Sequence, residues 1–200
     1  MVTKHLPANE RRAITVDAVV ELAAQQNPNE ITTAAIAKHM DVSQGALFKH
    51  FSSKEAILQA VMEWVAEVLL SRIDAAARHA PTPIAALEAM FIAHIEFIAE
   101  HSGVPRIMFG ELQRSGQTAP KRLVQTIMTR YRKRLYSLLE NAKNNHEVDE
   151  QLDIDTAITM FVGTIQGLVV QSLLSDNIQH IHHQAPQVFA IYLRGIGGKK

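Results

Sequence analysis

The chain has 200 residues, a length that suits one domain or two small domains that pack together. Its 20 Lys and Arg balance its 20 Asp and Glu, so net charge points to no partner and any contact with nucleic acid must be local. The absence of cysteine excludes disulfides and thiolate metal sites and suits the reducing cytosol. The first twelve residues contain no apolar run typical of a secretory signal, so we expect a cytoplasmic protein.

Helical spacing of apolar residues runs through almost the whole chain, and no segment shows a sustained two-residue alternation. Pro28 ends the first helix, and a Ser52-x-x-Glu55 capping box starts a helix of roughly 37 Å. The pattern predicts an all-α protein with about nine helices, at 9–26, 33–40, 43–50, 54–78, 84–101, 104–114, 119–142, 155–175 and 185–196.

The stretch TTAAIAKHMDVSQGALFKHF, residues 32–51, contains two short helical patterns separated by a four-residue interruption. Apolar residues in this stretch are spaced to form a small core against the first helix; they are Ile36, Met40, Val42, Leu47 and Phe51. No acidic residue lies on the outer face of the second helix, which carries Gln44, Gly45, Phe48 and Lys49. A helix–turn–helix of this size presents its second helix to the major groove of DNA.

Gly45 favours this interpretation, because a glycine inside a helix costs about 1 kcal/mol relative to alanine. A helix whose backbone must approach DNA closely can use the missing side chain. Gln44 can pair with adenine, and Ala46 can contact a thymine methyl. The predicted DNA contacts are Thr32, Thr33, Ser43, Gln44, Gly45, Ala46 and Phe48, with Lys49, His50 and Lys54 reaching phosphates. The alternative is a helical hairpin with a tolerated glycine and ordinary surface lysines.

Residues 12–58 resemble the DNA-binding head of the tetracycline-repressor (TetR/AcrR) family of bacterial transcriptional regulators. The segments that carry the resemblance are ITVDAVVELAA, ITTAAIAKHMDVSQGALFKHF and SSKEAIL. The family pattern is I-x-x-A-A, then T-x-x-x-I-A-x-x-x-G-V-S-x-G-x-L-Y-x-H-F, then S-K-E-x-L. The matching residues, which span about a quarter of the chain, are Thr33, Ile36, Ala37, Val42, Ser43, Gly45, Leu47, His50, Phe51, Ser53, Lys54 and Glu55.

Two residues depart from the family pattern. Asp41 stands where the family usually has glycine, and we expect the turn to survive because aspartate tolerates left-handed backbone geometry better than most residues. Phe48 stands where a tyrosine commonly donates its hydroxyl to a phosphate, so that hydrogen bond is lost. Base discrimination is therefore expected mainly from Gln44, Gly45, Ala46 and Lys49.

The resemblance implies a three-helix head, residues 1–55, joined by a long helix to a C-terminal helical domain, residues 56–200, that dimerises and holds a small-molecule pocket. It also implies a homodimeric repressor that binds a palindromic double-stranded DNA operator and is released by an unknown small-molecule effector. The alternative is a helical DNA-binding protein without an effector pocket, acting in nucleoid or division control as a few members of the family do. An enzyme is not expected, because the sequence shows no phosphate-cradling glycine loop, nucleophile elbow or zinc-binding H-E-x-x-H.

The segment 156–175 has no charged residue over a length that is roughly enough to span a bilayer. Its two glutamines and the lack of basic flanking residues instead favour a helix that protein covers on most of its faces, and no membrane contact is expected. Gly163 and Gly167 lie one turn apart and would let a second helix approach closely. The predicted dimer interface is Gly163, Gly167, Val170 and Leu174 with Val188, Ile191 and Tyr192; the alternative is the central helix of a monomer.

Methionine and aromatic residues are candidates for an effector pocket, although such residues more often belong to an ordinary core. The predicted pocket residues are Trp64, Phe91, His94, Met108, Phe109, Gln113 and Met128. HIHH, residues 180–183, lacks carboxylate or thiolate partners at a helpful spacing, so we interpret it as a solvated loop. No metal and no cofactor are predicted.

Overall fold

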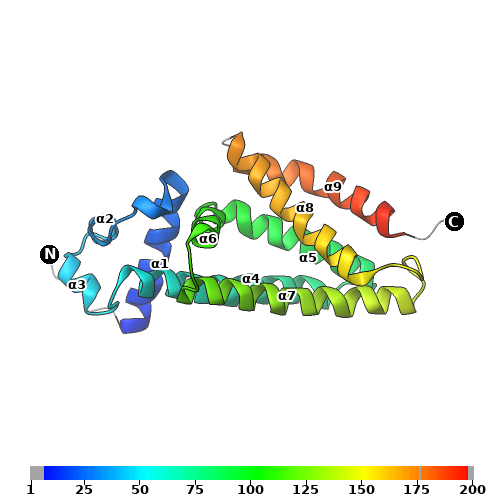
Figure 1. Cartoon of the computed structure of the whole chain (residues 1–200), viewed down its shortest axis with the longest axis horizontal. Coiled ribbons are helices and arrows are strands. Elements are labelled where there is room, and N and C mark those ends of the chain that lie inside the picture. Colours follow the sequence, from blue (N-terminus) through cyan, green and yellow to red (C-terminus); the bar gives the residue numbers. More distant parts are fainter. Residues whose placement is uncertain (1–6, 176, 198–200) are drawn as a thin grey trace. The chain divides into compact units, whose positions relative to one another are not determined.

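The computed structural model describes residues 7–175 and 177–197, and these ranges contain nine α-helices, two 3-10 helices and no strand (Figure 1). The α-helices are α1 (Ala8–Gln25), α2 (Thr33–His39), α3 (Gln44–Phe48), α4 (Lys54–Arg78), α5 (Pro83–Glu100), α6 (Gly103–Gln113), α7 (Ala119–Asn144), α8 (Ile154–Leu174) and α9 (Ile181–Ile196). The 3-10 helices are η1 (Pro28–Glu30) and η2 (Ile178–His180). The prediction of an all-α protein is confirmed.

Two compact units make up the chain, and they do not follow the predicted boundary after residue 55. The head unit contains the described residues up to Glu67 together with His101–Gln125. The body unit contains Val68–Glu100 and the described residues from Thr126 onward. α6 belongs to the head unit because it packs on α1, a contact between segments far apart in the sequence. α4 and α7 are continuous helices that contribute residues to both units.

Gly103 allows α6 to approach the backbone of α1. A Cβ atom added to Gly103 would lie 2.0 Å from the carbonyl oxygen of Val20 and 2.9 Å from the backbone nitrogen of Ala24. Neither atom can move away without bending α1, so only glycine fits at this position. The sequence pattern assigns Gly103 to a turn; the structure shows that it is the first residue of α6 and a packing contact of the head unit.

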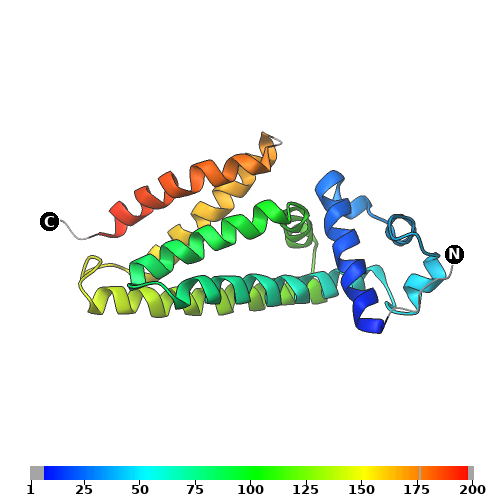
Figure 2. The ribbon, with the colours of Figure 1, turned by 180° about the vertical axis from the view of Figure 1, so that it is seen from behind.

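The core of the body unit is an aromatic cluster formed by α5, α8 and α9. Phe91 lies with its ring centroid 5.4 Å from that of Phe161 and 5.3 Å from that of Phe189. Tyr192 packs edge-on against Phe161 at 5.6 Å, and its hydroxyl donates a hydrogen bond to the carbonyl oxygen of Ala157 at 3.2 Å. Viewed from behind, α5 runs alongside α9, in agreement with their extensive contacts (Figure 2). These contacts fix α8 and α9 against each other.

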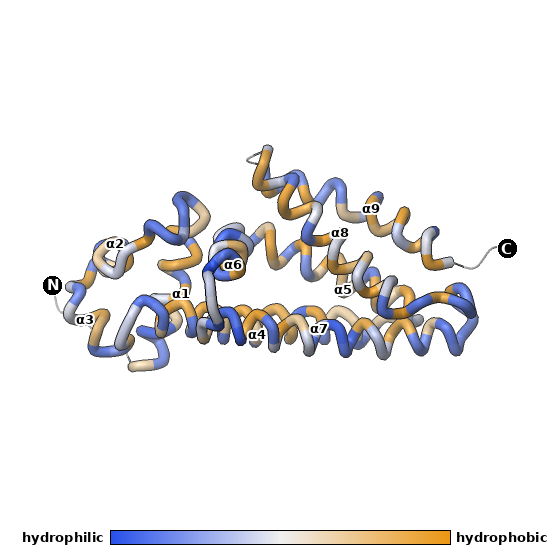
Figure 3. Tube along the Cα trace, viewed as in Figure 1, coloured by the Kyte–Doolittle hydropathy of each residue, from blue (hydrophilic) through white to orange (hydrophobic). Residues whose placement is uncertain are grey.

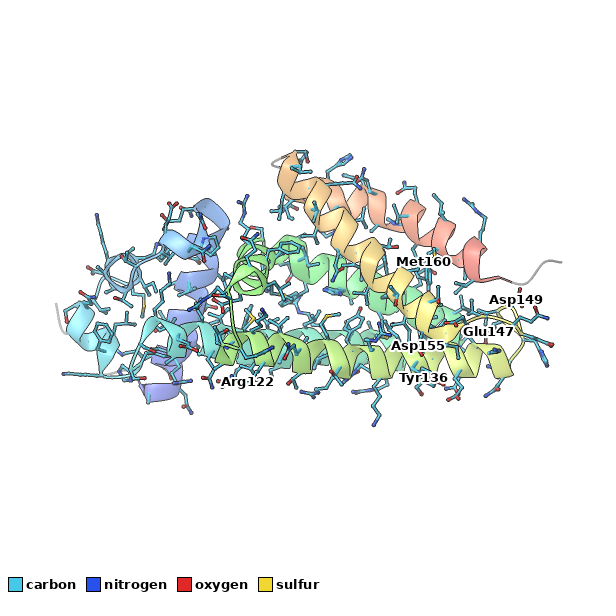
Figure 4. The ribbon with its side chains drawn as sticks, in the orientation of Figure 1. Arg122, Tyr136, Glu147, Asp149, Asp155 and Met160 are labelled. Carbon is cyan, nitrogen blue, oxygen red and sulfur yellow. The ribbon has the colours of Figure 1, made fainter. Side chains whose placement is uncertain are left out.

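Polar contacts fasten the loop between α7 and α8 to the rest of the body unit. Glu147 Oε2 accepts a hydrogen bond from the backbone nitrogen of Ile84 at 3.1 Å, and the backbone nitrogen of Asp149 donates to the carbonyl oxygen of Ile196 at 3.0 Å (Figure 4). Asp153 caps α8 by accepting from the backbone nitrogen of Thr156 at 2.7 Å, which lowers the pKa of this carboxyl. α8 therefore starts at a fixed point.

Gly103→Ala should lower the free energy of unfolding by about 1–3 kcal/mol, because its methyl group overlaps the backbone of α1. Gly110→Ala is the matched control in the same helix, since an added Cβ there would lie 3.5 Å from Asn29 Oδ1, an ordinary contact. Its better helix propensity should leave stability unchanged or raise it by up to about 1 kcal/mol. Urea unfolding of both variants measures this difference, and equal stabilities would show that α6 does not approach α1 this closely.

Candidate DNA-binding surface, effector residues and dimer face

Side-chain hydroxyls start the two short helices of the head unit. Thr32 Oγ1 accepts a hydrogen bond from the backbone nitrogen of Ala35 at 3.0 Å and caps α2. Ser43 Oγ accepts from the backbone nitrogen of Ala46 at 3.1 Å and caps α3. Caps of this kind contribute about 1 kcal/mol each, a large share for helices of seven and five residues.

A Schellman turn joins α2 to α3. The backbone nitrogen of Val42 donates to the carbonyl oxygen of Ala37 at 2.9 Å, and that of Asp41 donates to the carbonyl oxygen of Lys38 at 3.1 Å. Asp41 takes the left-handed position of this motif with φ 52°. The expectation that aspartate would preserve the turn in place of the usual glycine is confirmed, because both hydrogen bonds of the motif are present.

The predicted small core of the helix–turn–helix is present. Ile36, Leu47 and Phe51 are each no more than 2% exposed, while Met40 and Val42 are half-buried. The guanidinium of Arg12 lies 4.9 Å above the centre of the Phe51 ring and so covers it from α1. With the apolar sides of both helices buried in this way, α3 turns its remaining side chains outward.

The outer face of α3 carries the residues predicted to meet DNA. Gln44, Gly45, Phe48 and Lys49 are exposed, and Ala46 and His50 are half-buried. A Cβ atom added to Gly45 would meet only Ser43 Oγ, at 3.9 Å, so packing within the chain does not require glycine here. Phe48 leaves 45% of its surface exposed, which is unusual for a large apolar side chain of a soluble protein.

Sequence reasoning missed the contribution of α1 to this surface. An open groove extends from the start of α1, past α2, to α3. Arg11 of α1 lines it together with Lys38 of α2 and with Lys49 and His50, which follow the end of α3; Asp41 is its acidic residue. The signal was present in the sequence as the basic pair Arg11-Arg12 within the first turns of α1, but only the fold brings Arg11 to the groove.

Thr33 and Gln44 are in direct contact, which the sequence did not predict. Gln44 Nε2 donates a hydrogen bond to Thr33 Oγ1 at 2.8 Å. Each is the first residue of its helix, so the bond ties the first turn of α2 to the first turn of α3. One predicted DNA contact is therefore held in place by another.

Lys54 lies in a different place from the one predicted. Its ammonium donates to the carbonyl oxygens of Pro28 and Asn29, at 3.2 and 3.1 Å, and so ties the first residue of α4 to η1. Burial and the nearby Arg114 lower the pKa of Lys54. The prediction of a phosphate contact by Lys54 is wrong in this structure, because the groups that surround the ammonium belong to the head unit itself. Ser53, not Ser52, caps α4 by accepting from the backbone nitrogen of Ala56.

Two family models match the chain, and the first of them includes the helix–turn–helix. Residues 16–61 match the family described as bacterial regulatory proteins, tetR family, and residues 114–188 match a tetracyclin repressor-like C-terminal domain. The chain belongs to the TetR family. This TetR-family protein is therefore a DNA-binding transcriptional regulator, and the family is one of regulators and not of enzymes.

Among curated proteins, the nucleoid occlusion factor SlmA of Marinomonas sp. is 24% identical over 169 residues, 84% of this chain and 85% of that protein. SlmA of Haemophilus ducreyi is 32% identical over 102 residues, half of each chain. Among solved structures, the fatty acid degradation regulator FadR of Bacillus halodurans has a TM-score of 0.83 at 20% identity, covering 98% of this chain and 100% of that one. FadR of Bacillus subtilis in complex with stearoyl-CoA has a TM-score of 0.80 at 22% identity, covering 92% and 98%. These structural likenesses show the fold.

The predicted effector residues are divided between the two units. Trp64, Met108, Phe109 and Gln113 belong to the head unit, where Trp64 packs edge-on against His101 with centroids 4.9 Å apart and Gln113 is exposed. Phe91, His94 and Met128 belong to the body unit, where Phe91 is fully buried in the aromatic core. That these seven residues line one pocket stays a prediction.

His94, which is half-buried, and Tyr131, which is buried, form a polar pair in the body unit. His94 Nδ1 lies 3.2 Å from the Tyr131 hydroxyl oxygen, and the ring centroids are 5.3 Å apart. Burial lowers the pKa of His94 to about 4 and raises the pKa of Tyr131. The imidazole is therefore neutral at physiological pH, and the pair can offer hydrogen bonds without charge.

An exposed apolar stripe follows α8 and α9, and it includes most of the predicted dimer interface. Gly163 is open, since an added Cβ would meet nothing within 4 Å, and the same holds for Gly167. Leu174 is 83% exposed and Ile191 59% exposed, with Val170 also exposed and Val188 half-buried. Sequence reasoning missed Met160, which continues the stripe on α8 (Figure 4).

Tyr192 was predicted to lie in the dimer interface, and the structure corrects this prediction. It is 2% exposed and belongs to the aromatic core of its own chain. Ile191 and Tyr192 are neighbours on a helix and so point about 100° apart, which prevents both from lying on one exposed face. The stripe is therefore formed by Met160, Gly163, Gly167, Val170, Leu174, Val188 and Ile191.

Its own chain leaves much of α8 uncovered. Only 39% of its most apolar window is buried, and apolar segments recur along its length (Figure 3). The predicted cover includes a second protomer, so it stays a prediction that protein covers most faces of α8. Within the described residues, α8 is the one helix whose length and composition would allow a membrane crossing, and a single helix of this kind is weak evidence for one.

The histidine-rich segment is helical, which corrects the prediction of a loop. His180 ends η2, and His182 and His183 are exposed in the first turn of α9, which begins at Ile181 and not near residue 185. Across residues 7–175 and 177–197, no group of three or more His, Asp or Glu is arranged to hold a metal ion.

Lys54→Met should lower the free energy of unfolding by about 1–3 kcal/mol, because it removes a charged donor from two carbonyl oxygens while keeping the apolar stem. It should leave the salt dependence of DNA binding unchanged. Lys49→Met, at the exposed C-cap of α3, should do the reverse and reduce the slope of log K against log salt by about one unit. Chemical unfolding and binding titrations at several salt concentrations separate the two effects. A reduced slope of log K against log salt for Lys54→Met would show that Lys54 does contact a phosphate.

Stability should depend on pH through His94, whose folded-state pKa of about 4 lies below the unfolded value of 6.5. The contribution of His94 to the free energy of unfolding is fully present above pH 6.5 and is lost as pH falls towards 4. In this range the imidazole is protonated in the unfolded chain but remains neutral in the folded chain. The total loss is about 3 kcal/mol, on the order of 1.4 per pH unit. Unfolding of His94→Leu between pH 7 and 5 should show a weaker pH dependence than the wild type, whereas His182→Leu, on an exposed turn of α9, should match the wild type.

Proposed function

We propose that the protein is a homodimeric transcriptional regulator that binds a palindromic operator with α3 of each protomer in the major groove, and that a small-molecule effector lowers its affinity for DNA. The observation that carries the proposal is the outer face of α3. It is exposed, free of acidic residues over Gln44–Phe48, and open at Gly45 although glycine is not needed for packing. A surface with these properties fits a polyanion that must come close to the helix backbone.

Hydroxyl groups at the starts of α2 and α3 support phosphate contact. Thr32 and Ser43 accept hydrogen bonds from the helix backbone, and each hydroxyl keeps its own proton for donation. A phosphate bound at these hydroxyls would also lie next to the open backbone amides of the first helical turn, which favour an anion. Lys49 at the C-cap of α3 and Arg11 of α1 add positive charge. This arrangement explains DNA binding by a chain without net charge.

The exposed stripe on α8 and α9 supports the homodimer. A protein of this size seldom leaves so many large apolar side chains open on adjoining helices unless a partner covers them. The two open glycines would let the α8 helices of two protomers approach. A dimer with two-fold symmetry places two recognition helices in equivalent positions and therefore calls for a palindromic site.

For the effector we propose a site in the body unit beside His94 and Tyr131. His94 is half-buried and neutral, and Tyr131 is buried beside Phe161 of the aromatic core, which suits a largely apolar ligand with one polar group. The structural likeness to FadR of Bacillus subtilis, solved with stearoyl-CoA, makes acyl-CoA the first class to test. α4 is a continuous helix from the η1 contact of Lys54 to Arg78, so it can carry a displacement along the chain to the head unit.

A second candidate is a DNA-binding factor without an effector, acting on chromosomal DNA in the cytoplasm. It is favoured by the alignment with nucleoid occlusion factor SlmA of Marinomonas sp., which extends over 84% of this chain. The two candidates share the α3 surface and the dimer, and they differ in whether a small molecule changes DNA affinity.

Selection of duplexes from a random pool should return a palindrome, and stearoyl-CoA should weaken its binding by about 1–3 kcal/mol, a factor of roughly 5–150. Linkage requires the operator to weaken ligand binding by the same factor. Ligand that binds equally well with and without operator would favour the second candidate. A pool that returns no enriched sequence would contradict both.

Gly167→Leu should weaken the dimer without unfolding the protomer, because the space beside Gly167 is open in the single chain and is filled only by a partner. Ser137→Leu, on an exposed position of α7, adds the same side chain outside the stripe and serves as the control. Sedimentation equilibrium at micromolar concentration should show dissociation of Gly167→Leu alone. A wild-type protein that sediments as a monomer would contradict the proposed dimer.

A further inference from the structure

We propose that Thr33 is a positioning residue for base recognition, whose hydroxyl holds the Gln44 amide in the orientation that reads adenine. The inference rests on the proposed insertion of α3 into the major groove. The hydrogen bond from Gln44 Nε2 to Thr33 Oγ1 is 2.8 Å long and joins residues 11 positions apart in the chain. It is a contact between two helix starts and not part of either helix.

The hydroxyl of Thr33 is available to orient Gln44 because the hydroxyl of Thr32 already caps α2. Thr32 Oγ1 accepts from the backbone nitrogen of Ala35 and caps α2. Thr33, one residue later, is half-buried, and its hydroxyl accepts from the side chain of Gln44. The two consecutive threonines thus divide between starting α2 and orienting a side chain of α3.

The hydrogen bond decides which groups of the Gln44 amide remain for DNA. A glutamine amide has two N–H donors and one carbonyl oxygen, and one N–H is taken by Thr33. One N–H and the oxygen remain, which is a donor beside an acceptor. Adenine presents the complementary pair in the major groove, an N7 acceptor and an N6–H donor. Guanine presents two acceptors, N7 and O6, and the remaining N–H can satisfy only one of them.

Holding Gln44 in advance also reduces the cost of recognition. Its side chain is exposed, and a free glutamine would lose rotamer freedom when it binds a base. The neighbouring Gly45 leaves the approach open, since an added Cβ would meet only Ser43 Oγ at 3.9 Å. Removing the Thr33 hydroxyl would free both N–H groups of Gln44, which could then bind guanine as two donors.

The test compares duplexes that differ at the base pair facing Gln44, which is the position where Gln44→Ala abolishes base preference. The wild type should prefer adenine over guanine there by roughly 5- to 150-fold. Thr33→Val should reduce this ratio by at least about fivefold, mainly through a gain for guanine, whereas Thr33→Ser, which keeps a hydroxyl, should retain the wild-type ratio. The side-chain NH2 resonances of Gln44 provide a measurement without DNA, because exchange of the bonded proton should accelerate in Thr33→Val only.

Three results would overturn the inference: a Thr33→Val variant that keeps the wild-type ratio, one that binds all duplexes equally more weakly, or a wild type that shows no adenine preference at this position. Equal weakening would identify Thr33 as a phosphate contact. Failure of the proposed function is a different result, in which the wild type binds no duplex better than scrambled DNA.

Discussion

The DNA-binding surface depends on the capping and burial of two helices that are too short to exist alone. α2 has seven residues and α3 has five, well below the length at which an isolated helix is stable in water. Thr32 and Ser43 satisfy their first amides, and the burial of Ile36 and Leu47 holds the two helices against each other, with α2 packed on α1. Because these inward-facing groups carry the stability, the outward-facing residues of α3 are left to meet DNA.

The helix–turn–helix was predictable because its determinants are local. The two caps reach three residues ahead, the Schellman turn spans residues 37–42, and the core residues lie one helical turn apart. Even the substitution of aspartate for the usual glycine could be judged, since the position requires only a tolerated left-handed conformation. The same local chemistry located nine helices, and the start of α9 was misplaced because the three histidines of residues 180–183 were interpreted as a loop.

The errors concern contacts between residues far apart in the sequence. Lys54 donates to carbonyl oxygens 26 and 25 residues away, and Tyr192 donates to one 35 residues away. Gly103 is set by the backbone of Val20, so a packing glycine looked like a turn glycine. Each of these residue types commonly serves either in a surface or turn position or in a packing contact within the fold. Only the residue that it contacts in the folded chain distinguishes the two roles. The assignment of α6 to the head unit has the same origin, since its packing on α1 leaves no signal in the local sequence.

Phe48 shows how the surface compensates for a lost polar contact. A tyrosine at this position would donate to a phosphate, whereas Phe48 can offer only its exposed apolar ring. The head unit supplies positive charge from α1 instead, because Arg11 lines the same groove as Lys49. In the proposed complex with DNA, Arg11 and Lys49 would contact phosphates at the edge of the groove, while the ring of Phe48 would pack on a sugar or a thymine methyl. A contact with a methyl group depends on the base and is not screened by salt, so the exchange of hydroxyl for ring shifts this position from affinity towards sequence preference.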